Sequence, residues 1–219
     1  STLRDLASGL TDTQKHELLA TVIDESERLN RFIANLLDMT KLESGAIVPN
    51  AAPHDVGEIV GSALRRAGKI LVHHNVSLQL GADLPMLELD AVLFEQVLFN
   101  LLDNAAKYAP SGTTISVRGV RDGGYVMLQI MDEGSGIPPE ELESVFDKFY
   151  RAQKGDHVRP GTGLGLAISR GFIEAMYSSN KLRHRLAARD EASSVQFSVD
   201  SAEPPAYLRR KPLQGKKDL

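Results

Sequence analysis

Cysteine is absent from the 219-residue sequence. The chain therefore has no disulfide framework, no cysteine nucleophile and no thiolate metal site, and its composition is compatible with the cytosol. Long apolar runs are absent too, because no stretch approaches the roughly 18 residues that cross a bilayer. The first residues also lack the basic-then-apolar pattern of a signal peptide. We therefore expect this stretch of chain to be soluble.

A surplus of positive charge is the third absence. Lys and Arg number 25 against 29 Asp and Glu, which gives a net charge of −4. This balance gives no overall reason to expect binding to nucleic acid or to a membrane surface, so any site for polyanions has to be local. The hydrophobic fraction of 42% and the charged fraction of 25% are ordinary for a globular protein. The length predicts two structural units.

The first unit is predicted to be a long helix over residues 11–44. Thr11 and Gln14 have the spacing of a capping box at its start. Its length of about eight to nine turns favours an arm of a helical bundle over a core helix of a single domain. Residues 1–10 resemble the end of a preceding antiparallel helix. The apolar residues of the long helix recur at steps of three and four: Leu19, Val22, Ile23, Leu29, Phe32, Ile33, Leu36 and Leu37.

The second unit, from residue 51, mixes helices and short strands. The pattern predicts helices at 56–70 and 91–108, and strands at 76–80, 114–121 and 125–132. Gly123-Gly124 is a hairpin signal between the last two strands. The prediction is an α+β fold, a two-layer α/β sandwich with antiparallel strands and its helices on one face. Residues 133–163 form a long loop with one short helix at 138–145, and loops of this length are usually functional.

Three polar side chains lie on one side of the helix predicted at 91–108. Asn100, Asn104 and Lys107 are spaced by four and three residues. A solvated face would explain any one of them. Two asparagines in an apolar stretch need a further reason, because Asn is a mediocre helix former. Amide oxygens that bind a hard cation, beside a lysine for phosphate, supply that reason.

A turn rich in glycine follows the strand at 125–132. It contains Asp132, Gly134, Gly136 and Ile137. By itself this is an ordinary turn. A carboxylate accepts a hydrogen bond from an adenine amino group, and glycines let a base approach the backbone. Only the surrounding motifs distinguish the two interpretations.

Aromatic and basic residues follow at 146–151. Phe146 and Phe149 are explained equally well as core anchors of the loop. Lys148 and Arg151 would add positive charge toward a triphosphate if the loop folds over it.

A second glycine-rich segment leads into a helix predicted at 167–176. Glycines that run into a helix N-terminus expose backbone N–H groups and the positive end of the helix dipole to a phosphate. The segment matches neither a dinucleotide-binding fingerprint nor a P-loop. Its residues are Gly161, Thr162, Gly163, Leu164 and Gly165.

Taken in order, these segments resemble the N, G1, F and G2 boxes of the ATP-binding domain of sensor histidine kinases. They read NLLDNAAKY (100–108), DEGSGI (132–137), FDKFYRA (146–152) and GTGLGLAI (161–168). The stretch LNRFIANLLDMTKLESG (29–45) is similar to the second helix of the dimerisation and phosphotransfer hairpin of that family. LRRAGKILVHHNV (64–76) and the segments around the boxes resemble its potassium-sensing members.

The resemblance implies a fold of the GHKL (Bergerat) type. It divides the chain into a partial hairpin at 1–46, an ATP-binding domain at 51–201 and a flexible tail at 202–219. It implies a homodimer formed through the hairpin, and a cytoplasmic location beneath a parent protein of the bacterial inner membrane. Other regions of that parent would make the only membrane contact.

The resemblance also implies roles for single residues. Asn104 would be the principal Mg²⁺ ligand with Asn100 beside it, and Lys107 and Tyr108 would line the nucleotide pocket. Asp132 would bind the adenine amino group. Glycines 134 and 136 would shape that pocket, and glycines 161, 163 and 165 would hold the phosphates. The reaction would transfer the γ-phosphoryl group of ATP to a histidine and then to an aspartate of a response regulator, mainly through positioning and charge neutralisation.

Two features depart from the family pattern. The acceptor motif, a histidine followed by an acidic residue and an arginine-proline pair, is expected upstream of Ser1 and is absent, so we expect no self-phosphorylation. His16 lies on the second helix in a different local sequence. After Met176 the usual Gly-Gly turn is replaced by residues 177–190, which we expect to be irregular or disordered. Alternation at Val195, Phe197 and Val199 predicts a last strand.

Two other functions compete with the kinase. An ATPase-driven clamp of the same superfamily, such as gyrase, usually carries a glutamate general base where this chain has Asn100, and an amide cannot accept a proton from water. A non-enzymatic dimerisation module with a vestigial pocket is the second alternative.

Overall fold

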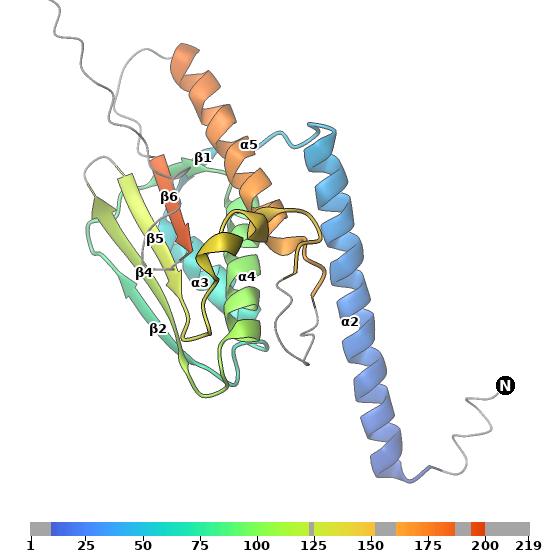
Figure 1. The fold of residues 1–219 in the computed structure, drawn as a ribbon. Helices are drawn as coiled ribbons and strands as arrows, with labels where there is room; N and C mark the ends of the chain where they lie inside the picture. Colours follow the sequence, from blue (N-terminus) through green and yellow to red (C-terminus); the bar gives the residue numbers. More distant parts are fainter. Residues whose placement is uncertain (1–9, 123–124, 152–160, 187–193, 200–219) are drawn as a thin grey trace, which may run out of the picture.

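The computed structural model describes residues 10–122, 125–151, 161–186 and 194–199. A four-stranded sheet is covered on one face by helices, and a long helix stands beside this layered unit (Figure 1). The helices are α2 (Asp12–Glu43), α3 (Val56–Ala67), α4 (Ala91–Tyr108) and α5 (Gly165–Leu186). The strands are β1 (Ala52–His54), β2 (Asn75–Leu80), β3 (Leu87–Leu89), β4 (Thr114–Asp122), β5 (Tyr125–Met131) and β6 (Ser194–Val199).

The large sheet has the order β2-β4-β5-β6. Only β4 and β5 pair antiparallel, whereas β2 runs parallel to β4 and β5 runs parallel to β6. The prediction of antiparallel strands is therefore wrong for two of the three pairings. The long helices α4 and α5 stand between β2 and β4 and between β5 and β6 in the sequence, and crossovers of that length permit parallel pairing. A small ribbon of β1 and β3, three residues each, was not predicted.

The core lies between the sheet and helix α4. Phe94, Val97, Leu98 and Leu102 of α4 are each 1% exposed. They face alternate residues of β4 and β5, among them Ile115 and Val126. α4 begins at Asp90, whose carboxylate accepts hydrogen bonds from the N–H groups of Val92 and Leu93 at 3.0 and 3.1 Å. Because α4 is anchored by this core, side chains on its remaining faces are held in fixed positions. The fold is the two-layer α/β sandwich of the GHKL type that the sequence predicts.

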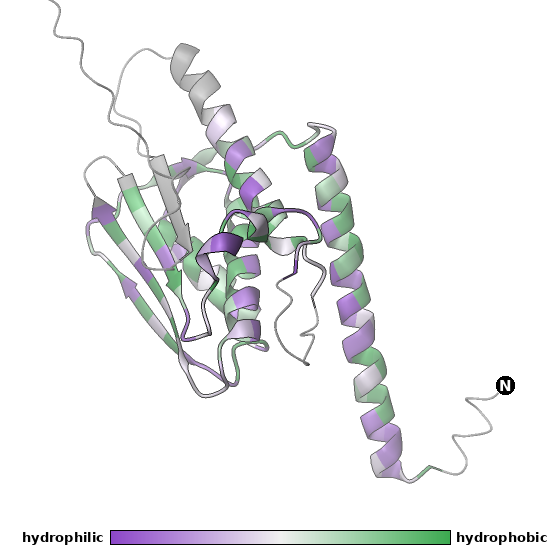
Figure 2. Ribbon diagram, in the orientation of Figure 1, coloured by the Kyte–Doolittle hydropathy of each residue, from purple (hydrophilic) through white to green (hydrophobic). Residues whose placement is uncertain are grey.

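Helix α2 confirms the predicted long helix almost to the residue. Thr11 caps its start in a reciprocal capping box with Gln14, and Ser44 caps its end. Apolar residues alternate with polar ones along its whole length (Figure 2). Its predicted apolar residues remain exposed, from 38% at Phe32 to 58% at Leu29. Only its C-terminal end joins the core, through the buried Met39 and the adjacent Leu42.

Three element boundaries differ from the predictions. The helix expected at 138–145 is instead two 3₁₀ turns, Pro139–Glu141 and Ser144–Phe146. Pro138 and Pro139 lack an amide hydrogen and favour such a short turn. Helix α3 stops at Ala67 because Gly68 ends it. Helix α5 continues through residues 177–186, which we expected to be irregular, since this stretch contains neither Gly nor Pro.

Several predictions lie outside the described residues. They are the preceding helix within 1–9, the Gly123-Gly124 turn, residues 187–190 of the irregular segment, and the tail at 202–219. The predicted last strand is confirmed as β6. Among the helices of the described ranges, none has the length and apolar content to span a membrane.

Candidate nucleotide site

Asn100 joins α4 to the beginning of α5. Its side chain is 7% exposed. The amide nitrogen Nδ2 donates to the Gly165 carbonyl and to Ser169 Oγ, each at 3.3 Å, and the oxygen Oδ1 accepts from Gln96 Nε2 at 3.4 Å. The glycine-rich segment is thereby tied to α4 at the position where the resemblance puts the first asparagine of the site.

Asn104 and Lys107 occupy the next turns of α4. Asn104 is half-buried, and its side chain makes no hydrogen bond to any other residue that the structure describes. The ammonium of Lys107 pairs with Asp103, one turn earlier on the same helix. The amide oxygen of Asn104 is therefore available to a ligand, whereas the charge of Lys107 is already partly balanced.

The loop after β5 folds back against the end of α4. One carboxylate oxygen of Asp132 accepts a hydrogen bond from the Gly134 N–H at 2.8 Å. A Cβ at Gly134 would lie only 3.0 Å from the carbonyl oxygen of Tyr108. Only a glycine allows this approach. It brings the exposed Asp132 beside Tyr108, whose side chain is 50% exposed.

Two backbone residues in the left-handed region meet across the loop. Phe149 has a φ of 63° and Gly163 a φ of 68°, and the N–H of Phe149 donates to the Gly163 carbonyl at 2.9 Å. A Cβ at Gly163 would lie 2.7 Å from the backbone carbonyl oxygen of Tyr150. A non-glycine residue at positive φ is strained and frequently marks a functional site. Phe149 is 59% exposed, so the alternative explanation of this residue as a core anchor does not hold.

The remaining glycine-rich residues occupy distinct environments. Leu164 is fully buried in the core, so it can offer a ligand only its backbone, and its N–H donates to Thr162 Oγ1 at 3.2 Å. Gly161 is exposed and Gly165 is half-buried at the first residue of α5. Gly136 has a φ of 69° with open space around its Cα, and Ile137 beside it is half-buried.

Charged side chains of the loop are engaged in several ways. Lys148 pairs with Glu43 of α2 at 2.5 Å, so its ammonium lies toward α2. Arg151 is exposed. Partial burial raises the pKa of the Tyr150 phenol, and its hydrogen bond to Glu141 and neighbouring carboxylates raise it further. The phenol is therefore neutral at physiological pH.

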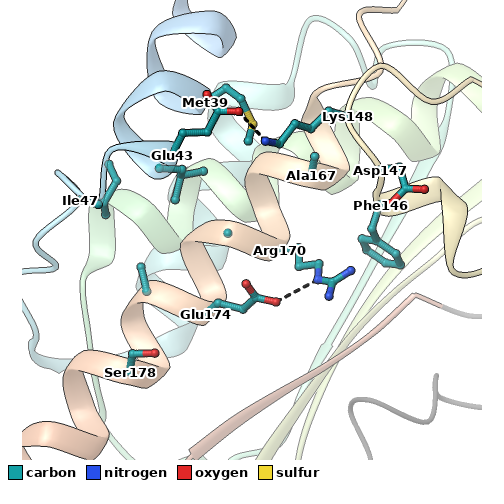
Figure 3. A pocket seen from close by; sticks show the side chains of 14 residues that line it. Met39, Glu43, Ile47, Phe146, Asp147, Lys148, Ala167, Arg170, Glu174 and Ser178 are labelled. Carbon is teal, nitrogen blue, oxygen red and sulfur yellow. Dashed lines mark hydrogen bonds and ion pairs between the residues drawn. The ribbon is translucent and has the colours of Figure 1, made fainter.

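An open cavity of about 510 Å³ lies elsewhere, between the end of α2, helix α5 and the second 3₁₀ turn (Figure 3). It contains the Glu43–Lys148 and Arg170–Glu174 ion pairs. Apolar residues Met39, Leu42 and Ile47 form its α2 side. Of the residues predicted to face the nucleotide, only Lys148 lines this cavity, so the cavity is distinct from the candidate site.

The structure thus joins all four predicted motifs through three contacts. Gly134 touches Tyr108, Asn100 bonds Gly165, and Phe149 bonds Gly163. Sequence reasoning missed Gln96 and Ser169, which complete the Asn100 network. The one signal for Ser169 was its position one turn after Gly165.

Residues 89–203 match the family described as "Histidine kinase-, DNA gyrase B-, and HSP90-like ATPase". This range contains all the predicted site residues. The chain belongs to this family. The sequence relatives include sensor proteins and a histidine-protein kinase. "Sensor protein KdpD" of Clostridium acetobutylicum is 36% identical over 176 residues, which is 80% of this chain and 20% of the relative. KdpD of Escherichia coli is 39% identical over 144 residues.

Solved structures agree with these sequence relatives. The "Mycobacterial sensor histidine kinase MprB" is 32% identical with a TM-score of 0.51, covering 58% of this chain and 80% of that one. "Acinetobacter baumannii histidine kinase AdeS" is 25% identical with a TM-score of 0.59, covering 79% and 80%. The chain is thus similar to the catalytic region of sensor histidine kinases, and it spans about a fifth of the length of the KdpD relatives.

Proposed function

We propose that this histidine-kinase domain binds Mg·ATP where α4, residues 132–137 and the start of α5 meet, and that it transfers the γ-phosphoryl group to a histidine. The observation that supports this most directly is that residues 132–137 and the start of α5 both contact the C-terminal half of α4. Gly134 approaches the Tyr108 carbonyl, and Asn100 bonds the first residue of α5. The turn at 132–137, proposed for adenine, and the N-terminus of α5, proposed for the phosphates, are thus both held against α4.

Asp132 is proposed to recognise adenine. Its Oδ1 is occupied by the Gly134 N–H, which fixes the orientation of the carboxylate. The other oxygen is exposed to accept a hydrogen bond from the adenine amino group. Gly136 and Ile137 would form the floor of this pocket, with Tyr108 and Phe149 beside it.

The phosphates are proposed to meet the glycine-rich start of α5. The first turn of an α-helix has N–H groups without intrahelical acceptors, and these attract anions. Glycines 161, 163 and 165 would leave room for the phosphates to approach the backbone. Thr162 and Leu164 would contribute backbone N–H groups, and Lys107 and Arg151 would add positive charge.

Magnesium is proposed to bind through Asn104, with Asn100 beside it. Within the described residues there is no cluster of three or more His, Cys, Asp or Glu that would hold a metal alone. That fits Mg²⁺, which commonly takes few protein oxygens and completes its shell with phosphate and water. The accessible amide oxygen of Asn104 fits this role. Mg²⁺ would neutralise charge on the phosphoryl oxygens as the transfer proceeds.

The partners are proposed from the family. The phosphoryl group would pass to a histidine on a hairpin helix and then to an aspartate of a response regulator, of the KdpE type if the KdpD relationship extends to function. The parent would form a homodimer through α2, with residues 1–46 as part of the hairpin, 51–201 as the catalytic domain and 202–219 as a tail. It would lie on the cytoplasmic side of the bacterial inner membrane.

A GHKL-type ATPase that hydrolyses ATP with water is the competing enzyme. The environment of Asn100 argues against it, because Nδ2 faces the Gly165 carbonyl and an amide cannot act as a general base. The exposed apolar side of α2 supports a dimerisation module, which becomes the better explanation only if no nucleotide binds.

Calorimetric titration with a non-hydrolysable ATP analogue and Mg²⁺ tests the proposal. We expect the unsubstituted chain to bind the analogue. Asp132→Asn should lower the affinity by about one to two orders of magnitude, because the new amide can turn its N–H toward the adenine amino group, which is also a donor. Asp24→Asn, at an exposed position of α2, is the matched control and should bind normally. If Asp132→Asn keeps its affinity, Asp132 does not bind the nucleotide. If the unsubstituted chain binds no nucleotide, the dimerisation module becomes the better explanation.

A further inference from the structure

Ser169 is a buried hydroxyl beside the candidate site. Its side chain is 4% exposed, on the second turn of α5. Oγ donates to the Gly165 carbonyl at 2.9 Å and accepts from Asn100 Nδ2 at 3.3 Å. Ser169 and Asn100 are the two buried polar residues among the residues described, and they bond each other. A polar pair retained inside an apolar core indicates a role that packing alone does not explain.

The direction of these hydrogen bonds is fixed by the Gly165 carbonyl. A carbonyl oxygen only accepts, so both the Ser169 hydroxyl and the Asn100 amide must present donors to it. Ser169 Oγ then accepts a hydrogen bond from the second N–H of the Asn100 amide. With Nδ2 facing α5, the Asn100 oxygen must point away from it, where Gln96 donates to it at 3.4 Å. Ser169 therefore helps to set the rotation of the Asn100 amide as well as the position of Gly165.

We propose that Ser169 is a positioning residue of the nucleotide site, which holds the glycine-rich start of α5 against α4 through Gly165 and Asn100. The inference rests on the proposed function. Gly165 is the first residue of α5, and the N–H groups of that turn are the proposed phosphate ligands. A carbonyl held by two side chains cannot swing outward, so the N–H groups at this helix start keep one direction. The adenine pocket, at the Asp132 turn, does not share these bonds.

The separation of the two subsites makes the role measurable. Ser169→Ala removes one hydroxyl from the phosphate side and leaves the adenine side intact. We expect affinity for ATP to fall about three- to tenfold, the scale of one neutral hydrogen bond. Affinity for adenosine should stay within about twofold of the parent value. Because the N–H groups at the start of α5 would contact the phosphates directly, the ATP loss should appear without Mg²⁺ as well as with it.

Three further measurements complete the test. Ser178→Ala, an exposed serine on the same helix, is the matched control and should leave both affinities unchanged. Ser169→Thr retains a hydroxyl that can bond the carbonyl one turn earlier, and should restore ATP affinity. In a double-mutant cycle, adding Ser169→Ala to Asn100→Ala should cost less than Ser169→Ala alone, since the two side chains act on one carbonyl.

Three results overturn the inference alone, given that the unsubstituted chain binds ATP. Two of them are an equal loss of ATP and adenosine affinity in Ser169→Ala, or no change in either affinity. A Ser169→Ala chain that no longer folds, judged by circular dichroism, also overturns it, because it would show that the residue supports the whole core. A parent chain that binds adenosine and ATP equally weakly overturns the proposed function as well.

Discussion

At the residue scale, the two asparagines of α4 have different surroundings one turn apart. Asn100 is buried, and its side chain forms hydrogen bonds with Gln96, Gly165 and Ser169. Asn104 is half-buried, and its amide makes no side-chain hydrogen bond within the described part of the chain. The two asparagines therefore have different roles in this conformation. Asn100 joins α4 to α5, and Asn104 is available to a metal.

Replacing Asn104 by alanine should weaken nucleotide binding chiefly when Mg²⁺ is present. The variant loses one amide oxygen as metal ligand, and alanine is a better helix former, so α4 should not suffer. We expect a loss of about tenfold or more with Mg²⁺ and less than about twofold without it, measured by calorimetry. Equal losses in the two conditions would instead assign Asn104 to packing.

The site residues show what sequence can predict at this scale. The spacing of Asn100, Asn104 and Lys107 placed them on one side of a helix, and the structure has that helix at the predicted residues. The spacing could not show that Asn100 is buried against α5, because that contact joins residues 65 and 69 positions apart. Lys148 was expected near a triphosphate, but its pairing with Glu43 depends on where α2 packs, which no local pattern encodes.

At the element scale, α2 and α5 touch at a glycine. A Cβ at Gly171 would lie 2.7 Å from Leu42 Cδ1 and 3.0 Å from Cδ2, so the Leu42 side chain packs directly against the backbone of Gly171. The Glu43–Lys148 pair lies next to this contact, but both side chains are about half exposed, so the pair contributes at most about 1 kcal/mol. The close approach of Leu42 to Gly171 therefore determines the position of α2 more than the ion pair does.

A valine at Gly171 should separate these two helices without unfolding the catalytic domain. Overpacking of this kind typically costs about 1–3 kcal/mol. We expect faster hydrogen–deuterium exchange in the last two turns of α2 and unchanged exchange in α4. Gly61→Val on α3 is the control, since a Cβ there would meet only the end of the Arg65 side chain, at 3.4 Å. Leu42→Ala should restore slow exchange in Gly171→Val, and failure to do so would contradict this account of the contact.

Elements with strong local signals were predicted well, and elements defined by distant partners were not. The capping box of α2 and the apolar periodicity of α4 gave their bounds within one residue. Strands β1 and β3 have three residues each, too few to show alternation, and they exist because they pair across 30 or more positions. The parallel pairing of β2 with β4 likewise follows from how α4 packs, which alternation within a strand does not reveal.

At the scale of the whole molecule, the exposed apolar side of α2 predicts self-association. Nine large apolar residues of α2 are at least 38% exposed. We expect sedimentation to show a dimer, and Ile33→Glu to weaken it at least a hundredfold, roughly, because each copy loses about 1.5–3 kcal/mol of burial. Arg31→Glu, at an exposed position on the opposite, polar side of α2, should leave the dimer intact. A parent chain that is monomeric at all concentrations would refute this prediction.

The phosphoryl acceptor is the second prediction at this scale. The 219 residues contain no histidine in the acceptor motif, so radiolabelled ATP should leave the chain unlabelled. A separate hairpin that carries the acceptor histidine should gain acid-labile, base-stable phosphate when it is added. His16, exposed on the first turns of α2, is the residue to monitor. Stoichiometric acid-labile label on His16 would mean that the phosphotransfer site has been misplaced.

Helix α2 also has a mechanical property that follows from its length and from its apolar attachment at one end. Its 32 residues make a rod of about 48 Å, capped at both ends and packed on the catalytic domain near Met39 and Leu42. The exposed ion pair between Glu27 and Lys69, at 3.7 Å, is a weak further contact. A rod fixed at one end is a lever. A tilt of about 5° at the attachment moves the free end by about 4 Å, most of one helical turn. Conversely, a displacement of one helical turn at the free end changes the angle between α2 and α5 by only a few degrees.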